Sequence, residues 1–190
     1  MLKNTVEYKR FVWEFNNTIN CKNQRYDKII FLCIGTNAIV GDAFGPVVGS
    51  VLKRFFQNDK SVLIMGDLQN TITYNDIPEK QIYINNNYKN SLIIVLDSAL
   101  SELHNLGKIF IQNRGLKYAE SLRKKNNTIG NISIKAIVGV NTNDSLINFN
   151  NLENASIENL ELMSKIVYNG IIDVMYKRKN NGKNIYKYIS

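Results

Sequence analysis

Residues 29–56 read IIFLCIGTNAIVGDAFGPVVGSVLKRFF, and this stretch decides the fold. Its first six residues are all apolar, which is typical of a strand buried on both faces. A loop with three glycines and the carboxylate of Asp42 follows, and Pro46 fits the first position of a helix, where its missing N–H costs nothing. Open α/β sheets begin in this way, and they bind ligands beyond the carboxyl ends of their strands. We therefore expect Asp42 to lie in the ligand-binding crevice beyond the carboxyl end of this first strand.

The rest of the chain alternates between strand and helix patterns. Apolar runs at 61–66, 92–96 and 132–140 predict strands, and residues 108–112 predict an edge strand. Helical spacing predicts helices at 5–19, at 157–175, and from a cap at Asn75 or Asp76 to Tyr88, with Pro78 in its first turn. Residues 113–130 are expected to be irregular and 141–150 a loop, with a frayed polar segment after Tyr176. This order indicates an α/β fold with three layers, α/β/α, around a mostly parallel sheet.

The length of 190 residues fits a single α/β domain, 1–190, in which 1–27 form a leading helix and connector and 178–190 a polar tail. No apolar run approaches the roughly 20 residues that span a bilayer, and the N-terminus lacks the apolar core of a signal peptide. We therefore expect a cytoplasmic protein without a membrane partner. Cys21 and Cys33 cannot build a disulfide framework, and Cys33, inside the apolar strand, is expected to be inert.

The formal net charge of +8 is concentrated near the two ends of the chain. One interpretation is a polyanion partner held by a salt-sensitive basic surface. The other is that solvated ends carry these charges in a chain rich in Lys and Asn. Because the sequence has no aromatic-interleaved stacking motif and no zinc-finger spacing, we favour the second interpretation and do not expect nucleic-acid binding.

The glycine loop does not match the phosphate-binding fingerprints. Gly41 is followed by Asp42 where a P-loop has Lys, and Gly35, Gly41 and Gly45 are spaced too widely for GxGxxG. A carboxylate in the loop would also repel a phosphate. No nucleotide and no other cofactor is therefore expected.

Asp42 and Asp97 form the strongest candidate site. Asp42 follows the first core strand, and Asp97 stands at the end of the apolar run 92–96. If these strands are neighbours, both carboxylates face one crevice, and the charge of one raises the pKa of the other. Such a pair can activate water and protonate a leaving amine. The alternative is that Asp42 caps the helix near Pro46 and Asp97 only ends a strand.

Other polar residues near these two carboxylates are candidates for binding a substrate. We place Gly41, Asp67, Asn70 and Ser98 in this group, although Asp67 and Asn70 can equally form a turn and a cap. His104 is the single histidine, and a lone His is more often a surface residue than a metal ligand. Ser98 and Ser101 lack the GxSxG elbow of a nucleophilic serine.

The segments GTNAIVGDAFGPVVG and, some fifty residues later, IIVLDSAL resemble the YyaC-type spore protease family. That family is similar to the spore germination protease and, more distantly, to the hydrogenase maturation endopeptidases. The resemblance implies a phosphorylase/hydrolase-like α/β fold, catalytic roles for Asp42 and Asp97, and peptide-bond hydrolysis. It also implies a protein or peptide substrate, such as small acid-soluble spore proteins, and residence in the spore or forespore of a sporulating bacterium.

Departures from the family pattern leave alternatives open. The chain is shorter than the germination protease and lacks the insertions that would shape a peptide cleft, so a non-catalytic sporulation protein on the same scaffold is one alternative. A hydrogenase-type enzyme that recognises a metal in its substrate is another, but its expected later histidine is missing, since His104 lies seven residues beyond Asp97. No metal of its own is predicted, and a homo-oligomer stays open.

Overall fold

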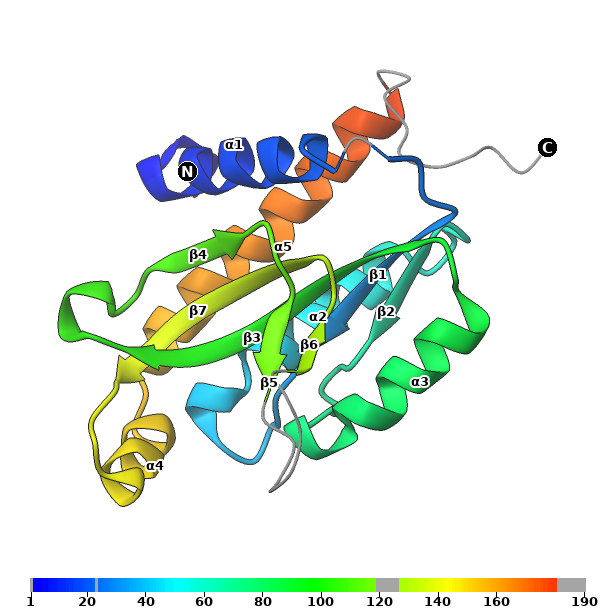
Figure 1. Ribbon diagram of the computed structural model, residues 1–190. Helices are drawn as coiled ribbons and strands as arrows, with labels where there is room; N and C mark the ends of the chain where they lie inside the picture. Colours follow the sequence, from blue (N-terminus) through cyan, green and yellow to red (C-terminus); the bar gives the residue numbers. More distant parts are fainter. Residues whose placement is uncertain (1, 23, 119–126, 181–190) are drawn as a thin grey trace.

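A five-stranded sheet forms the centre of the computed structural model, which describes residues 2–22, 24–118 and 127–180. The strand order is β2-β1-β3-β7-β4 (Figure 1). The bounds are β1 (Lys28–Cys33), β2 (Val62–Met65), β3 (Ser91–Ser101), β4 (Ile109–Gln112) and β7 (Ile132–Val140). The first four strands in this order run parallel, and β4 pairs with β7 in the antiparallel sense at the edge. The predicted mostly parallel sheet and its edge strand are confirmed.

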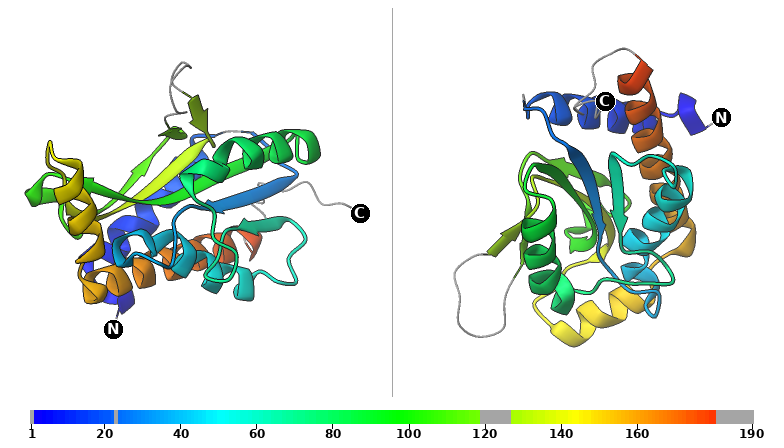
Figure 2. Two further views of the ribbon diagram at one scale, coloured as in Figure 1. Left: turned by 90° about the horizontal axis from the view of Figure 1, so that it is seen from below. Right: turned by 90° about the vertical axis from the view of Figure 1, so that its right-hand side faces the viewer.

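Helices cover both faces of this sheet. One face carries α1 (Val6–Asn20), α2 (Phe44–Phe55) and α5 (Ile157–Asn180), as the left view of Figure 2 shows. The other carries α3 (Ile77–Asn87) and a hairpin of β5 (Leu116–Tyr118) and β6 (Asn127–Ile129). The three-layer α/β/α fold is thus confirmed. Among the helices of the described ranges, none is long and apolar enough to cross a membrane.

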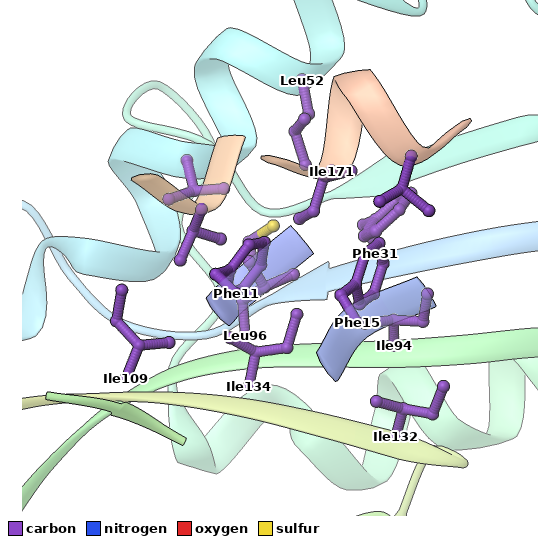
Figure 3. Packing of buried hydrophobic residues seen from close by; sticks show 14 of the residues in the cluster. Phe11, Phe15, Phe31, Leu52, Ile94, Leu96, Ile109, Ile132, Ile134 and Ile171 are labelled. Atoms are coloured by element: carbon purple, nitrogen blue, oxygen red, sulfur yellow. The ribbon is translucent and has the colours of Figure 1, made fainter. Parts of the chain in front are cut away.

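Two hydrophobic cores explain the uninterrupted apolar run of β1. Successive side chains of a strand point to opposite faces, so Phe31 joins the core beneath α1, α2 and α5, while Leu32 joins the core beneath α3 and the hairpin. In the larger core the rings of Phe11 and Phe15 stack with their centroids 5.7 Å apart (Figure 3). Because both faces of the sheet are buried, β1 and β3 lie in the middle of the molecule.

The leading helix follows its predicted pattern. Thr5 caps α1 by accepting the backbone N–H of Tyr8, and the buried stripe of the helix faces α5 and the sheet. Close packing with α5 occurs at Gly170, where an added Cβ would lie 2.4 Å from the Phe11 ring. The stripe consists of Tyr8, Phe11, Phe15 and Ile19.

The connection from β1 to α2 turns sharply at Gly35. Its φ of 138° lies in a region that side chains disfavour, and an added Cβ would lie 2.0 Å from the carbonyl oxygen of Asp42. The loop therefore folds back on itself before the short 3-10 turn η2 (Val40–Asp42). Helix α2 begins at Phe44, so Pro46 lies within the first turn and not at the first helical position as we predicted.

Several predicted boundaries are wrong. β3 does not end at Leu96 but continues to Ser101, because β7 offers it a partner as far as the pair Ser101–Val140. The region 113–130, predicted to be irregular, contains the β5–β6 hairpin, whose Leu116 and Tyr118 are buried; residues 119–126 lie outside the described ranges.

Two predictions for the C-terminal third also change. The predicted loop 141–150 contains most of α4 (Ser145–Glu153), which Asp144 caps through the N–H groups of Leu146 and Ile147. The final helix α5 continues through Asn180 and does not fray after Tyr176. Arg178, which we placed in a polar tail, is only 8% exposed, and its Nη1 donates to the side-chain oxygens of Asn16 and Asn20. The rest of that tail, residues 181–190, lies outside the described ranges.

Candidate functional site

The carboxyl edge of the sheet brings the two candidate aspartates together. β1 ends at Cys33, opposite Leu96, whereas β3 continues past it, so Asp97 is the first residue of β3 beyond its pairing with β1. Its pairing partner on the other side is Lys135 of β7. Asp97 lies on the face of the sheet that α3 and the hairpin cover, and only 1% of its surface is exposed.

Asp97 is a buried carboxyl group with one oxygen bound and one free. The Tyr74 hydroxyl donates a 2.7 Å hydrogen bond to Oδ2. Oδ1 is buried and has no hydrogen-bond partner within the described part of the chain. The pKa of Asp97 is raised to about 7: burial is the largest cause and the charge of the Asp42 carboxylate adds to it, although the hydrogen bond from Tyr74 and the Lys135 ammonium oppose the shift. A carboxyl group in this state can hold a proton near neutral pH.

Asp42 is held by two hydrogen bonds and does not cap a helix. The backbone N–H of Thr36 donates to Oδ2 at 2.9 Å, and the Ser98 hydroxyl donates to Oδ1 at 3.2 Å. The N-cap of α2 is Ala43, without a side-chain hydrogen bond, so the alternative role of Asp42 as a helix cap is wrong. Burial raises the pKa of Asp42, whereas the bonds from Ser98 and Thr36 favour its ionised form.

The two carboxylates approach β3 from different sides. Ser98 follows Asp97 in the strand, so its side chain leaves on the opposite face, where it reaches Asp42. The groups nevertheless interact through their charges, because Asp42 raises the pKa of Asp97, and both raise the pKa of Tyr74. The two carboxyl groups thus lie on opposite sides of β3 at the same edge of the sheet.

Tyr74 is a site residue that sequence analysis missed. It begins the 3-10 turn η3 (Tyr74–Asp76), in which the Asp76 carboxylate accepts both the N–H and the hydroxyl of Thr73 at 2.8 Å. This capping box is visible in the sequence as Thr73 followed three residues later by Asp76. The pattern predicts a turn, but it does not indicate that the tyrosine reaches a carboxylate on a distant strand.

Asp67 and Asn70 shape the loop that follows β2. Oδ1 of Asp67 accepts the N–H groups of Gln69 and Asn70 at 2.8 Å, and Oδ2 binds the Lys53 ammonium. The loop lies against the glycine loop, since the Asn37 amide donates to the Leu68 carbonyl at 2.9 Å. Both oxygens of Asp67 are thus engaged, Oδ1 in holding this turn and Oδ2 in binding Lys53 of α2.

Gly41, which precedes Asp42, is a point of close packing. It is buried, and an added Cβ would lie 2.7 Å from the carbonyl oxygen of Leu152 in α4. A side chain at this position would push α4 away from η2. Gly41 thus allows α4 to support the loop that carries Asp42.

Metal ligands and a reactive thiol are not assembled in the described residues. These residues contain no group of three or more His, Cys, Asp or Glu that could hold a metal ion. His104 is exposed and lies 3.2 Å from the Glu102 carboxylate. Cys33 is fully buried, which raises the pKa of its thiol and keeps it in the unreactive form.

Comparisons with known proteins relate this chain to a protein family, to a curated protein and to a solved structure. The family described as Protein of unknown function (DUF1256) matches residues 3–170. Uncharacterized protein YyaC of Bacillus subtilis (strain 168) is 30% identical over 112 residues, which are 59% of this chain and 54% of YyaC, so the matched segment spans about half of that relative. The NiFe hydrogenase maturation protease HycI from Thermococcus kodakarensis KOD1 aligns over 74% of this chain and 92% of that chain, with a TM-score of 0.40 and 17% identity.

Proposed function

We propose that this chain, which belongs to the YyaC-type family DUF1256, is a peptide-bond hydrolase in which Asp42 and Asp97 are the catalytic groups. The observation that carries the proposal is the state of Asp97. Its carboxyl group is buried at the carboxyl edge of a parallel sheet, one of its oxygens is free, and its pKa is raised to about 7. Perturbed carboxyl groups at such edges are typical of acid–base sites.

The proposed roles follow from the surroundings of the two carboxylates. Asp42 accepts two hydrogen bonds, which favour its ionised form, so it takes a proton from the attacking water. The oxygen of that water forms a bond to the carbonyl carbon of the substrate. Asp97, buried and protonated, gives its proton to the leaving nitrogen as the C–N bond breaks. Asp42 then returns its proton to solvent, and Asp97 regains one.

The substrate class is proposed from the sequence resemblance to the germination protease. We expect a protein or peptide substrate, with small acid-soluble spore proteins as the first candidates, and a place in the spore or forespore. Gly41, Asp67 and Asn70 contribute to this role by shaping the two loops beside the carboxylates, and Ser98 contributes by holding Asp42.

The test is cleavage of small acid-soluble spore proteins by the purified chain, followed by mass spectrometry. Asp42→Asn and Asp97→Asn should each lower the cleavage rate by about 100-fold or more, because general acid and base groups contribute at least this much. Asp27→Asn serves as the control, since Asp27 is exposed in the connector before β1. Cleavage that both site variants retain would overturn the proposal.

A chain that cleaves no protein or peptide, although it is folded by circular dichroism, would favour the non-catalytic alternative. A hydrogenase-type role would require recognition of a metal on the substrate by Asp42 and Asp97. Selective broadening of the NMR signals of these two side chains by added paramagnetic Ni²⁺ would support that role.

A further inference from the structure

The segment that carries Tyr74 is anchored on both sides. Before it, the Ile72 carbonyl accepts the N–H of Gly35 at 2.8 Å, and the Ile72 side chain is buried in the core beneath α3. After it, the Thr73–Asp76 capping box closes η3. The position of the Tyr74 hydroxyl is therefore fixed by the glycine loop and by the start of α3, and not by Asp97 alone.

Tyr74 links a buried group to the surface. Asp97 is 1% exposed, whereas Tyr74 is 45% exposed, and the two are joined by the 2.7 Å hydrogen bond to Oδ2. A buried carboxyl oxygen without a partner is costly, and Oδ1 is such an atom within the described residues. The bond from Tyr74 therefore decides which of the two oxygens is hydrogen-bonded and which is left buried without a partner among the described residues.

We infer that Tyr74 is a positioning residue for Asp97: its hydroxyl holds Oδ2 and so fixes the orientation of the carboxyl group, and its ring shields that group from solvent. This inference rests on the proposed function only for its catalytic consequence. The orientation of the Asp97 carboxyl group and its shielding by Tyr74 are properties of the folded protein, and both can be measured without any substrate.

Four groups determine how Asp97 responds to the loss of this bond. The Tyr74 hydroxyl of η3 donates to it, the charges of Lys135 in β7 and of Asp42 in η2 act on it, and the backbone N–H of Ser98 lies beside it in β3. The Tyr74 hydroxyl favours the ionised form of Asp97, so its removal raises the pKa of Asp97 further. The Asp42 and Lys135 side chains remain in a Tyr74→Phe variant, and this direction is therefore specific to the lost hydroxyl.

The first experiment compares Tyr74→Phe with Tyr83→Phe by NMR titration of the Asp97 carboxyl carbon. Tyr83 is a matched control, because it is 46% exposed and lies on the adjacent helix α3. We expect the Asp97 titration to move to higher pH in Tyr74→Phe and to stay in place in Tyr83→Phe. An Asp97 titration that is the same in Tyr74→Phe and in the unchanged protein would overturn the inference.

The second experiment measures how well the Tyr74 ring shields the Asp97 carboxyl group from solvent. A water-soluble carbodiimide with glycine ethyl ester labels accessible carboxyl groups, and peptide mass spectrometry locates the label. Asp97 should react at least several-fold faster in Tyr74→Ala than in the unchanged protein, whereas Tyr74→Phe, which keeps the ring, should resemble the unchanged protein. Equal labelling of Asp97 in all three proteins would overturn the covering role.

The catalytic consequence is read as a split between kcat and KM. Misplacement of a catalytic group lowers the rate of the chemical step, so Tyr74→Phe should lower kcat about tenfold or more and leave KM nearly unchanged. If the NMR and labelling results hold while no protein cleaves a substrate, the positioning of Asp97 stands and the proposed function fails. If cleavage occurs but kcat is equal in Tyr74→Phe and Tyr83→Phe, the positioning role is overturned and the proposed function stands.

Discussion

The Ser98 hydroxyl donates a 3.2 Å hydrogen bond to Oδ1 of Asp42, across 56 residues of sequence. This bond ties the loop after β1 to the central strand β3, at the point where β3 extends beyond its neighbour. Asp42 and Asp97 are thus brought to one edge of the sheet by a residue that directly follows Asp97 in the chain. Ser98→Ala removes the bond without changing the size of the side chain appreciably.

We predict that Ser98→Ala moves the acidic limb of the cleavage pH profile to higher pH. The Ser98 bond lowers the pKa of Asp42, so its loss raises that pKa. Asp42 acts as a base only when ionised, and its activity is therefore lost at a higher pH as the solution is acidified. The measurement is kcat/KM as a function of pH, with Ser101→Ala on the same strand as the control. An acidic limb that does not move would contradict the role given to Ser98.

We predict that Asp97→Asn stabilises the protein most at high pH. The folded-state pKa of about 7 is above the ordinary value near 4, so the folded state binds the proton more tightly than the unfolded state. The stability that this provides is complete below about pH 4 and is lost as the pH rises through about 7. Asn carries no charge at any pH, so the gain should reach the order of a few kcal/mol above pH 8.

Urea denaturation at pH 5 and pH 8.5 measures this difference in the free energy of unfolding. Asp27→Asn controls for the loss of one negative charge from an exposed position. A stabilisation by Asp97→Asn that is equal at the two pH values, or larger at pH 5, would contradict the raised pKa of Asp97 in the folded state.

We predict that Gly35→Ala costs far more stability than Gly107→Ala. Both glycines have a positive φ, 138° and 77°, but a Cβ on Gly35 would lie 2.0 Å from the Asp42 carbonyl, whereas a Cβ on Gly107 meets no atom within 4 Å. Backbone strain alone should cost about 1 kcal/mol at Gly107, and the added clash should bring Gly35→Ala to the order of 3 kcal/mol. Thermal unfolding of the two variants checks this, and equal losses would contradict it.

We predict that Gly170→Ala destabilises the contact between α1 and α5. Ala favours a helix over Gly by about 1 kcal/mol, but the new Cβ would lie 2.4 Å from the buried Phe11 ring. Overpacking of this kind costs about 1–3 kcal/mol, so a net loss is expected. In a double-mutant cycle with Phe11→Leu, the double variant should lose less than the sum of the two single changes. Additive losses of stability would show that the Phe11 ring moves aside from the new Cβ without cost.

Much of the architecture was predictable because its patterns are local. The apolar run of β1, the helical stripe of α1 and the alternation of β4 each depend on residues that lie within a few positions of one another. The short α4 was missed because Asn-rich segments have a low helix propensity, although Asp144 offered a cap signal. The length of β3 was missed because a strand ends where its partner ends, and the sequence does not show which strand is that partner.

The sequence by itself determined the layers of this protein and identified Asp42 and Asp97 as the candidate carboxylates, because hydrophobic periodicity and the glycine loop are local patterns of the chain. Only the tertiary structure decided that Asp97 lies inside β3 and not at its end, that Ser98 holds Asp42, and that Tyr74 binds Asp97. The physical reason is burial. The pKa of a carboxyl group depends on which distant side chains and how little water surround it, and no local pattern in the sequence specifies that environment.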